Sequence, residues 1–275
     1  MEKPAPDPIL PTEGRHVLHL FFRIDYGSWD LLDGTQKIEA KTSLAELVQE
    51  IRATPDTQLL TFSVATPKAD LGFMLVTPDL HVADGFAKQL GLSLGPGVLV
   101  PEYSWLSLTE RSEYTTSDEE YARALETEEN LVPGTPAYEE KLTAFRVRMT
   151  KYLKDRLEPN LPDWPVVCFY PMSKRRGAEG QNWYALDFAA RKTLMAGHAR
   201  VGRTYSGRVL QLITGSTGLD DMEWGVTLFA RTTSEIKAII YEMRFDEVSA
   251  QYADFGEFFI GLQMPLDGLF DRLAI

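Results

Sequence analysis

Residues 166–211 contain three kinds of side chain that could do chemistry together. The first kind is a phenol on a predicted strand. Alternate residues of a strand point to the same side, so Tyr170, Met172 and Lys174 share one face. A tyrosine on a strand is usually a core residue, but this phenol has an ammonium on the same face.

The second kind is an imidazole near the end of a predicted helix. Asp187 is the expected N-cap of this helix, and the helical period predicts its inward stripe. The stripe consists of Phe188, Arg191, Leu194 or Met195, and His198. A single histidine on such a face is more often a packed core residue than a ligand, although neutral imidazole commonly binds iron.

The third kind is a concentration of cations within a chain of net charge −12. From Lys174 to Arg208 the acids are Glu179 and Asp187 alone. The cations in the same stretch are Lys174, Arg175, Arg176, Arg191, Lys192, Arg200, Arg203 and Arg208. Such a patch around an apolar stripe indicates a ligand with an apolar body and several carboxylates or phosphates.

Composition limits the class of protein. A chain of 275 residues with 44% hydrophobic content can form one large domain or two ordinary ones. The single cysteine, Cys168, excludes an intrachain disulfide, and without a CxxCH sequence covalent haem attachment is not expected. With no apolar leader and no run of about 18 apolar residues, we expect a cytoplasmic protein without a membrane span. The acidic charge argues against a nucleic-acid partner.

Hydrophobic patterns predict two successive βαββαβ units. In the first unit, strands are expected at 16–26, 59–66, 71–77 and 98–109, with helices at 43–53 and 81–90. A capping-box sequence from Ser43 to Glu46 opens the first of these helices. In the second unit, strands are expected at 166–174, 209–215, 224–231 and 257–263, with helices at 187–200 and 233–245. This order indicates an α+β fold of two ferredoxin-like units whose sheets pack or join into a barrel.

The intervening segment has a different character. It begins as an acidic stretch, passes a Pro133-Gly134-Thr135-Pro136 break and continues as a predicted amphipathic helix at 137–157. The expected division of the chain is therefore an N-terminal extension, a first ferredoxin-like domain, a connector with a long helix and a second ferredoxin-like domain. Their ranges are 1–15, 16–109, 110–165 and 166–275.

Several sequence strings resemble a known family. From about Arg156 to Leu262 the chain is similar to the chlorite dismutase-like superfamily, and within it to the coproheme decarboxylase branch with a distal glutamine. The strings are FYPMSKRR, NWY, LMAGHARVGRTYSG, QLITGSTGLDDMEWGVTLFA and YEMRFDEVSAQYADFG. The first half resembles the family only in its order of elements and its opening strand. The resemblance implies a dimeric α+β barrel within one chain, haem in the second half and assembly as a homopentamer.

The resemblance also implies an activity in haem biosynthesis. Members of this branch use hydrogen peroxide to convert the 2- and 4-propionates of coproheme (iron coproporphyrin III) into vinyl groups, which gives haem b. Peroxide oxidises the iron porphyrin, and a tyrosyl radical then removes a hydrogen atom from the propionate. The substrate, coproheme, is therefore also the redox cofactor. A further implied partner is the coproporphyrin ferrochelatase that supplies coproheme.

The same resemblance assigns the central residues of the site. His198 matches the proximal iron ligand, Tyr170 the radical relay and Gln211 the distal residue. Chlorite dismutases have a distal arginine, whose permanent charge can hold an anionic oxychlorine species, so the neutral Gln211 gives that reaction little support. Lys174 lies about 13 Å along the strand from Tyr170 and is expected to anchor the second propionate or supply its proton.

The remaining contacts to the porphyrin follow from the resemblance as well. Arg156, Arg203, Arg244 and Ser249 match positions that bind the propionates, a task that suits bidentate guanidinium pairing with carboxylates, and Met172 is expected to contact the ring. The RFDE and DEVSA strings could instead form ion pairs at helix ends. Two other functions stay open, namely another haem peroxidase of the same fold and a protein that binds haem or porphyrin without turnover.

Overall fold

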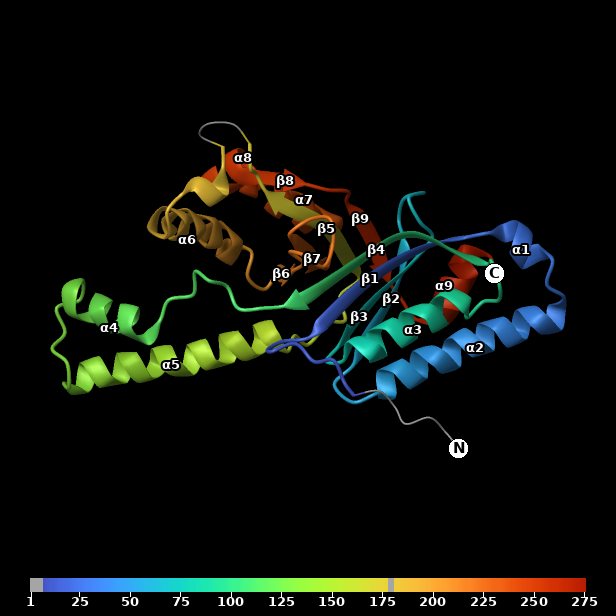
Figure 1. The fold of residues 1–275 in the computed structure, drawn as a ribbon, viewed down its shortest axis with the longest axis horizontal. Coiled ribbons are helices and arrows are strands. Elements are labelled where there is room, and N and C mark those ends of the chain that lie inside the picture. The colour runs from blue at the N-terminus through green and yellow to red at the C-terminus, as the bar shows by residue number, and fades with distance from the viewer. Residues whose placement is uncertain (1–6, 178–180) are drawn as a thin grey trace.

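One closed antiparallel β-barrel forms the centre of the computed structural model, which describes residues 7–177 and 181–275 (Figure 1). The strand order is β4-β1-β3-β2 in the first half and β9-β5-β7-β6 in the second, and β2–β9 and β4–β6 pairings close the ring. Both halves therefore have the strand order of a ferredoxin-like unit, and the predicted α+β fold is confirmed. Residues 1–6 of the N-terminal extension and Glu179 lie outside the described residues.

The first unit follows the predicted order with one displaced helix start. Its elements are β1 (His16–Ile24), α1 (Tyr26–Asp30), α2 (Gly34–Ala53), β2 (Gln58–Val64), β3 (Leu71–Thr77), α3 (Leu80–Leu92) and β4 (Leu99–Thr109). The predicted capping box at Ser43 is wrong, because Asp33 and Gln36 form that box and begin α2 much earlier. Residues 34–43 of α2 are mostly exposed, so they show no apolar period that would have revealed this turn.

The second unit contains the strands on which the candidate site depends. Its elements are β5 (Val166–Lys174), η1 (Trp183–Ala185), α6 (Phe188–Thr204), β6 (Val209–Gly215), β7 (Trp224–Ala230), α7 (Thr233–Met243), α8 (Glu247–Tyr252), β8 (Ala253–Phe255), β9 (Phe259–Gln263) and α9 (Leu266–Leu273). Strands β5 and β6 have the predicted bounds. The predicted helix 233–245 ends slightly early, because α7 stops at Met243 with Arg244 as its C-cap, and the following helix α8, capped by Asp246, was not predicted.

The connector between the units forms two helices that project from the barrel (Figure 1). Helix α5 (Pro136–Leu157) was predicted, whereas α4 (Asp118–Thr127) was not. Ser117 and Glu120 form a capping box at the start of α4, and acidic residues in its first turn suit the helix dipole. Tyr121 of α4 stacks on Phe145 of α5 at 4.1 Å, so the acidic stretch is packed against the long helix.

Both units contribute side chains to a single barrel interior. The interior contains Val17, Phe21, Phe62, Met74, Trp105, Phe169, Leu212, Phe229 and Phe259, among others. Trp105 comes from the first unit, and its indole Nε1 lies 2.5 Å from where a Cβ on Gly225 of the second unit would stand. Glycine is therefore required at position 225 so that the indole can lie against the back of β7.

His19 is a fully buried polar residue in this interior. Its Nε2 hydrogen-bonds to Thr227 Oγ1 at 2.9 Å, its ring stacks on Phe169, and its Nδ1 has no partner among the described residues. Burial lowers the pKa of His19 to about 3, against an ordinary value of 6.5. The imidazole is thus neutral in the folded protein at any pH near neutrality.

Stability is therefore expected to depend on pH through His19. Below about pH 6.5 the unfolded chain binds a proton at this histidine, whereas the folded protein does not. The contribution of His19 to the free energy of unfolding is therefore constant above pH 6.5 and decreases as the pH is lowered towards 3. The loss is about 1.4 kcal/mol per pH unit. Denaturant unfolding of wild type and His19→Gln between pH 7 and 5 tests this; equal slopes in the two proteins would refute it.

No helix in the described part of the chain is both long and apolar enough to cross a membrane.

Candidate functional site

The outer face of the sheet β6-β7-β5 carries the predicted strand residues. Across the sheet, Tyr170 is level with Val226 of β7, and Gln211 of β6 is level with Leu228 of the same strand. Two strand spacings and two residues along the strand separate the Cα atoms of Tyr170 and Gln211 by roughly 12 Å. The phenol and the amide therefore occupy two separate positions on one face.

Tyr170 lies in an aromatic and strongly desolvated environment. Its side chain is 5% exposed and its ring stacks on Phe258 with centroids 4.4 Å apart. Burial raises the pKa of Tyr170 well above its ordinary value, Cys168 adds to this rise, and the nearby Arg244 guanidinium opposes it. The residue is accordingly a neutral phenol, which can lose a hydrogen atom but does not ionise near pH 7.

His198 is held by a carboxylate that the sequence interpretation did not identify. Its Nδ1 lies 3.0 Å from Asp246 Oδ2, and the other Asp246 oxygen accepts the Val248 backbone N–H at the start of α8. Burial disfavours the Asp246 charge, but hydrogen bonds from His198 and Ser249 outweigh it, so its pKa is lowered. The carboxylate fixes the tautomer with hydrogen on Nδ1 and leaves Nε2 with a lone pair for a metal.

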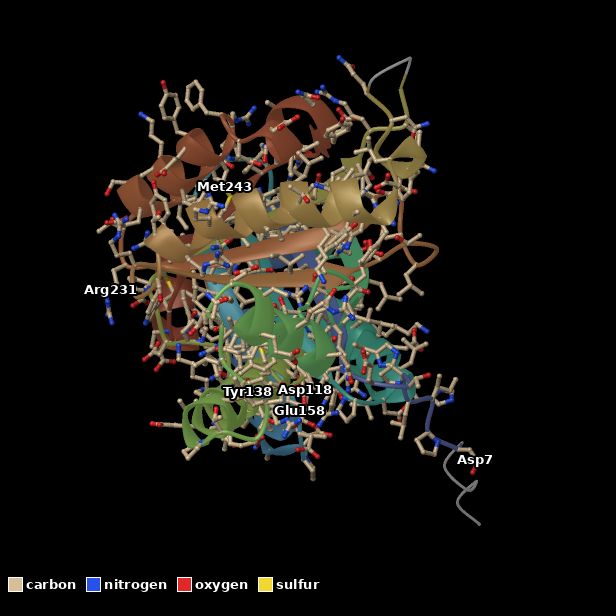
Figure 2. The ribbon with its side chains drawn as sticks, turned by 90° about the vertical axis from the view of Figure 1, so that its left-hand side faces the viewer. Asp7, Asp118, Tyr138, Glu158, Arg231 and Met243 are labelled. Atoms are coloured by element: carbon tan, nitrogen blue, oxygen red, sulfur yellow. The ribbon has the colours of Figure 1, made fainter. Side chains whose placement is uncertain are left out.

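Helix α6 brings His198 towards the sheet. Gln211 Nε2 donates to the carbonyl of Gly202 at 3.5 Å, and a Cβ on Gly202 would lie 3.2 Å from that nitrogen and 3.3 Å from Met243. Met243 lies beside α6 in the view of Figure 2. His198 precedes Gly202 by one helical turn, so both share the helix face that meets the sheet.

Helix α6 lies over the sheet, yet not one of its residues is buried (Figure 2). Most of the predicted stripe is half-buried and contacts η1, α8 and the connector, for instance Leu194 and Met195 beside Trp183. Phe188 departs from the prediction, because 46% of it is exposed where it stacks beside Tyr114. The helix is therefore held by partly exposed apolar contacts together with polar ones such as that of Arg191 with Tyr114.

Lys174 is a buried ammonium at the end of β5. It is 9% exposed, and its Nζ rests 4.7 Å from the centroid of the Trp183 ring. No described residue accepts a hydrogen bond from this Nζ. Burial lowers the pKa of Lys174 to about 8, and the Asp246 and Glu223 carboxylates oppose that shift. A buried cation of this kind favours an anionic ligand beside it.

The other predicted contacts lie around the same face at different depths. Ser249 is buried and hydrogen-bonds to Asp246, and Met172 packs at the edge of the apolar cluster around Tyr170. Arg244 lies over the Phe255 ring at 5.0 Å. Arg203 is exposed in the last turn of α6, and Arg156 donates from Nε to the Glu110 carbonyl at 2.7 Å.

The expected cation patch is largely neutralised within the protein. Arg175, Arg176, Arg191, Lys192 and Arg208 form ion pairs with Asp254, Glu223, Glu113, Glu120 and Glu235. Two of these acids, Glu113 and Glu120, come from the connector, which the tertiary fold brings beside α6. Lys174, Arg200 and Arg203 form no ion pair with a described residue, so these cations remain for a ligand.

The described residues contain no cluster of three or more His, Cys, Asp or Glu side chains that could hold a metal ion. A haem iron needs only one protein ligand, because the macrocycle supplies the equatorial nitrogens. His198 with its Asp246 partner provides such a ligand, and the uncompensated cations suit the acid groups of a porphyrin. The residues present therefore fit an iron porphyrin.

Comparison with known proteins gives consistent results. A family model described as chlorite dismutase matches residues 37–264. A haem-binding protein from Thermus thermophilus has 34% sequence identity and a TM-score of 0.79, over 98% of this chain and 100% of that one. A mutant chlorite dismutase from Candidatus Nitrospira defluvii has 19% identity and a TM-score of 0.71, over 96% and 98% of the two chains, which shows the shared fold.

Proposed function

The chain belongs to the chlorite dismutase family, and from that membership we propose that it is a peroxide-dependent coproheme decarboxylase. The proposed reaction converts two propionate arms of iron coproporphyrin III into vinyl groups and yields haem b. In this family the relatives include haem enzymes, so an iron porphyrin is the natural ligand, and coproheme would serve as both substrate and redox group.

One observation carries the proposal: Tyr170 and Lys174 share a face of β5, a neutral phenol and a buried ammonium about 13 Å apart along the strand. A phenol can be oxidised to a phenoxyl radical that removes a hydrogen atom, and an ammonium can bind a carboxylate. A substrate that carries several acid arms on an oxidisable ring would use both groups. A substrate without acid arms would leave the buried Lys174 ammonium without a hydrogen-bond acceptor.

The distal residue distinguishes this proposal from chlorite dismutation. Gln211 is neutral, so it supplies no permanent charge to hold an oxychlorine anion near iron. Its Nε2 instead donates a hydrogen bond, here to the Gly202 carbonyl. The same donor can turn to a peroxide oxygen without introducing a charge.

In the proposed mechanism His198 Nε2 would bind the iron, and Asp246 would keep that imidazole in one tautomer and strengthen its electron donation. When bound, the iron porphyrin supplies the oxidising power of peroxide. Tyr170 gives up its hydroxyl hydrogen as one proton and one electron, and as a phenoxyl radical it removes a hydrogen atom from the nearer arm. Lys174 and Arg244 hold carboxylates by charge-assisted contacts, and the Phe258 ring excludes water from the phenol.

We expect purified protein to convert iron coproporphyrin III into haem b when hydrogen peroxide is added. Mass spectrometry of the extracted porphyrin should show the loss of two formic-acid equivalents, through an intermediate that has lost one. Oxidation of an added electron donor without mass loss would identify another haem peroxidase. Binding without either change would identify a porphyrin-binding protein, and both outcomes contradict the proposed function.

A further inference from the structure

Glu223 is a buried carboxylate beside the proposed site that has no role in the mechanism so far. Its side chain is 8% exposed, and it directly precedes β7. Its backbone N–H lies 3.0 Å from the Met172 carbonyl and 3.2 Å from Ser173 Oγ. The backbone of Glu223 is therefore fixed to the same strand that carries Lys174.

The carboxylate of Glu223 is directed back at the end of β5. Its Oε2 accepts the Lys174 backbone N–H at 2.8 Å, and its Oε1 lies 3.6 Å from Arg176 Nη2. The Tyr184 hydroxyl donates a further hydrogen bond to this carboxylate. Tyr184 is 47% exposed and the Arg176 side chain 69%, so the buried acid is connected to the surface through both residues.

The groups that act on the Lys174 ammonium are two carboxylates and one aromatic ring, and they come from three parts of the second unit. Glu223 stands before β7, Asp246 caps α8, and the Trp183 ring of η1 lies under the Nζ. Both carboxylates favour the charged lysine, whereas burial disfavours it. Asp246 has the larger effect and also holds His198 and the start of α8, whereas Glu223 hydrogen-bonds to the backbone of Lys174 itself.

The proposed reaction requires a proton for each arm. Written with an ionised arm, one propionate, one peroxide and one proton give one vinyl group, one carbon dioxide and two waters. The arm loses two electrons and the peroxide gains them. The oxygen derived from peroxide must therefore receive a proton.

We propose that Glu223 is a positioning residue that holds Lys174 in place and in its charged form, so that Lys174 can supply the proton consumed at each decarboxylation. In this step a Lys174 Nζ–H bond breaks, the amine keeps the electron pair, and the proton is passed along hydrogen-bonded groups of the site to the peroxide-derived oxygen, where an O–H bond forms. The neutral amine is then reprotonated from solvent. The use of the proton rests on the proposed function. The electrostatic coupling between Glu223 and Lys174 does not.

The coupling can be measured without porphyrin. In protein labelled with [13Cε]lysine, the Lys174 resonance is identified by its absence in Lys174→Arg, and its titration midpoint is read by NMR. Glu223→Gln removes the charge and keeps the shape, and we expect the midpoint to fall by roughly one pH unit or more. Tyr184→Phe, which removes a hydrogen bond to the same carboxylate but keeps its charge, should leave the midpoint almost unchanged.

The pH profile of decarboxylation gives the second measurement. The alkaline limb of the rate should move to lower pH in Glu223→Gln by the same amount as the NMR midpoint, whereas Tyr184→Phe should keep the wild-type limb. Glu223→Asp, which retains the charge at a greater distance, should fall between wild type and Glu223→Gln, and it provides the test if the glutamine variant does not fold. An unchanged Lys174 midpoint in the folded Glu223 variant overturns the proposal.

The two proposals fail in different ways. If wild type does not decarboxylate coproheme, the proposed function is wrong whatever the NMR titration shows. If wild type does decarboxylate and the midpoint shifts but the alkaline limb stays in place, the proton-supply role of Lys174 is wrong while the function stands.

Discussion

Tyr170→Phe is expected to lower the rate of the first decarboxylation by at least about 10³-fold, on the order of 4 kcal/mol in activation free energy. Phenylalanine has no hydroxyl hydrogen to lose, so no phenoxyl radical forms at this position. The ring and its stacking on Phe258 are retained, and the buried face of β5 should pack as before. Single-turnover mixing with peroxide, followed by mass analysis of the porphyrin, measures this rate.

The same variant gives a spectroscopic result that does not depend on turnover. Rapid-freeze electron paramagnetic resonance after peroxide addition should show a tyrosyl signal in wild type and lose it in Tyr170→Phe. Tyr205→Phe is the matched control, because Tyr205 is equally buried but donates its hydroxyl to Glu242 at 2.6 Å. A Tyr170→Phe protein that decarboxylates at the wild-type rate would show that the radical does not reside there.

His198→Ala is expected to abolish axial nitrogen ligation of the iron and to weaken binding of iron coproporphyrin III. The alanine removes Nε2, the one lone pair that Asp246 leaves available on this helix face. Asp246→Asn keeps a hydrogen-bond acceptor beside Nδ1 but removes the charge, so we expect a smaller loss, about 10- to 100-fold in affinity. Porphyrin titrations and the absorption spectrum of the ferric complex provide the two measurements.

Folding separates a ligand role from a core role for His198. Helix α6 buries none of its residues, so His198→Ala should remain folded, and added imidazole should restore the nitrogen-ligated spectrum. Global unfolding of the variant would instead indicate a packed core histidine. Unchanged ligation in a folded variant would place the iron elsewhere.

Much of the second unit could be predicted from local patterns. Strands β5 and β6 alternate between the interior and the outer face, so their bounds and the shared face of Tyr170 and Lys174 follow from a period of two. Helix α6 was identified from its Asp187 cap, although it extends to Thr204. Regular periodicity and strong caps are signals that a single sequence contains.

The side-chain pairs of the site that were missed depend on contacts between distant residues. Asp246 lies 48 positions after His198, and Glu223 lies 49 positions after Lys174, so no period or short motif links the members of either pair. Neutralisation of Arg191 and Lys192 by the connector has the same origin, since Glu113 and Glu120 approach α6 only through the tertiary fold. A carboxylate at a helix start, as in RFDE, was the one available hint of Asp246.

The shared barrel interior gives the first half of the chain a part in the chemistry of the second. The Trp105 indole supports β7 from behind at Gly225, between Trp224 and the Val226 that is level with Tyr170. A smaller side chain in place of that indole would let the strand settle inward and carry the phenol's neighbours with it. Amino-acid changes at the barrel interior of the first unit are thus constrained by the site geometry of the second unit, although the first unit contains none of the reactive groups.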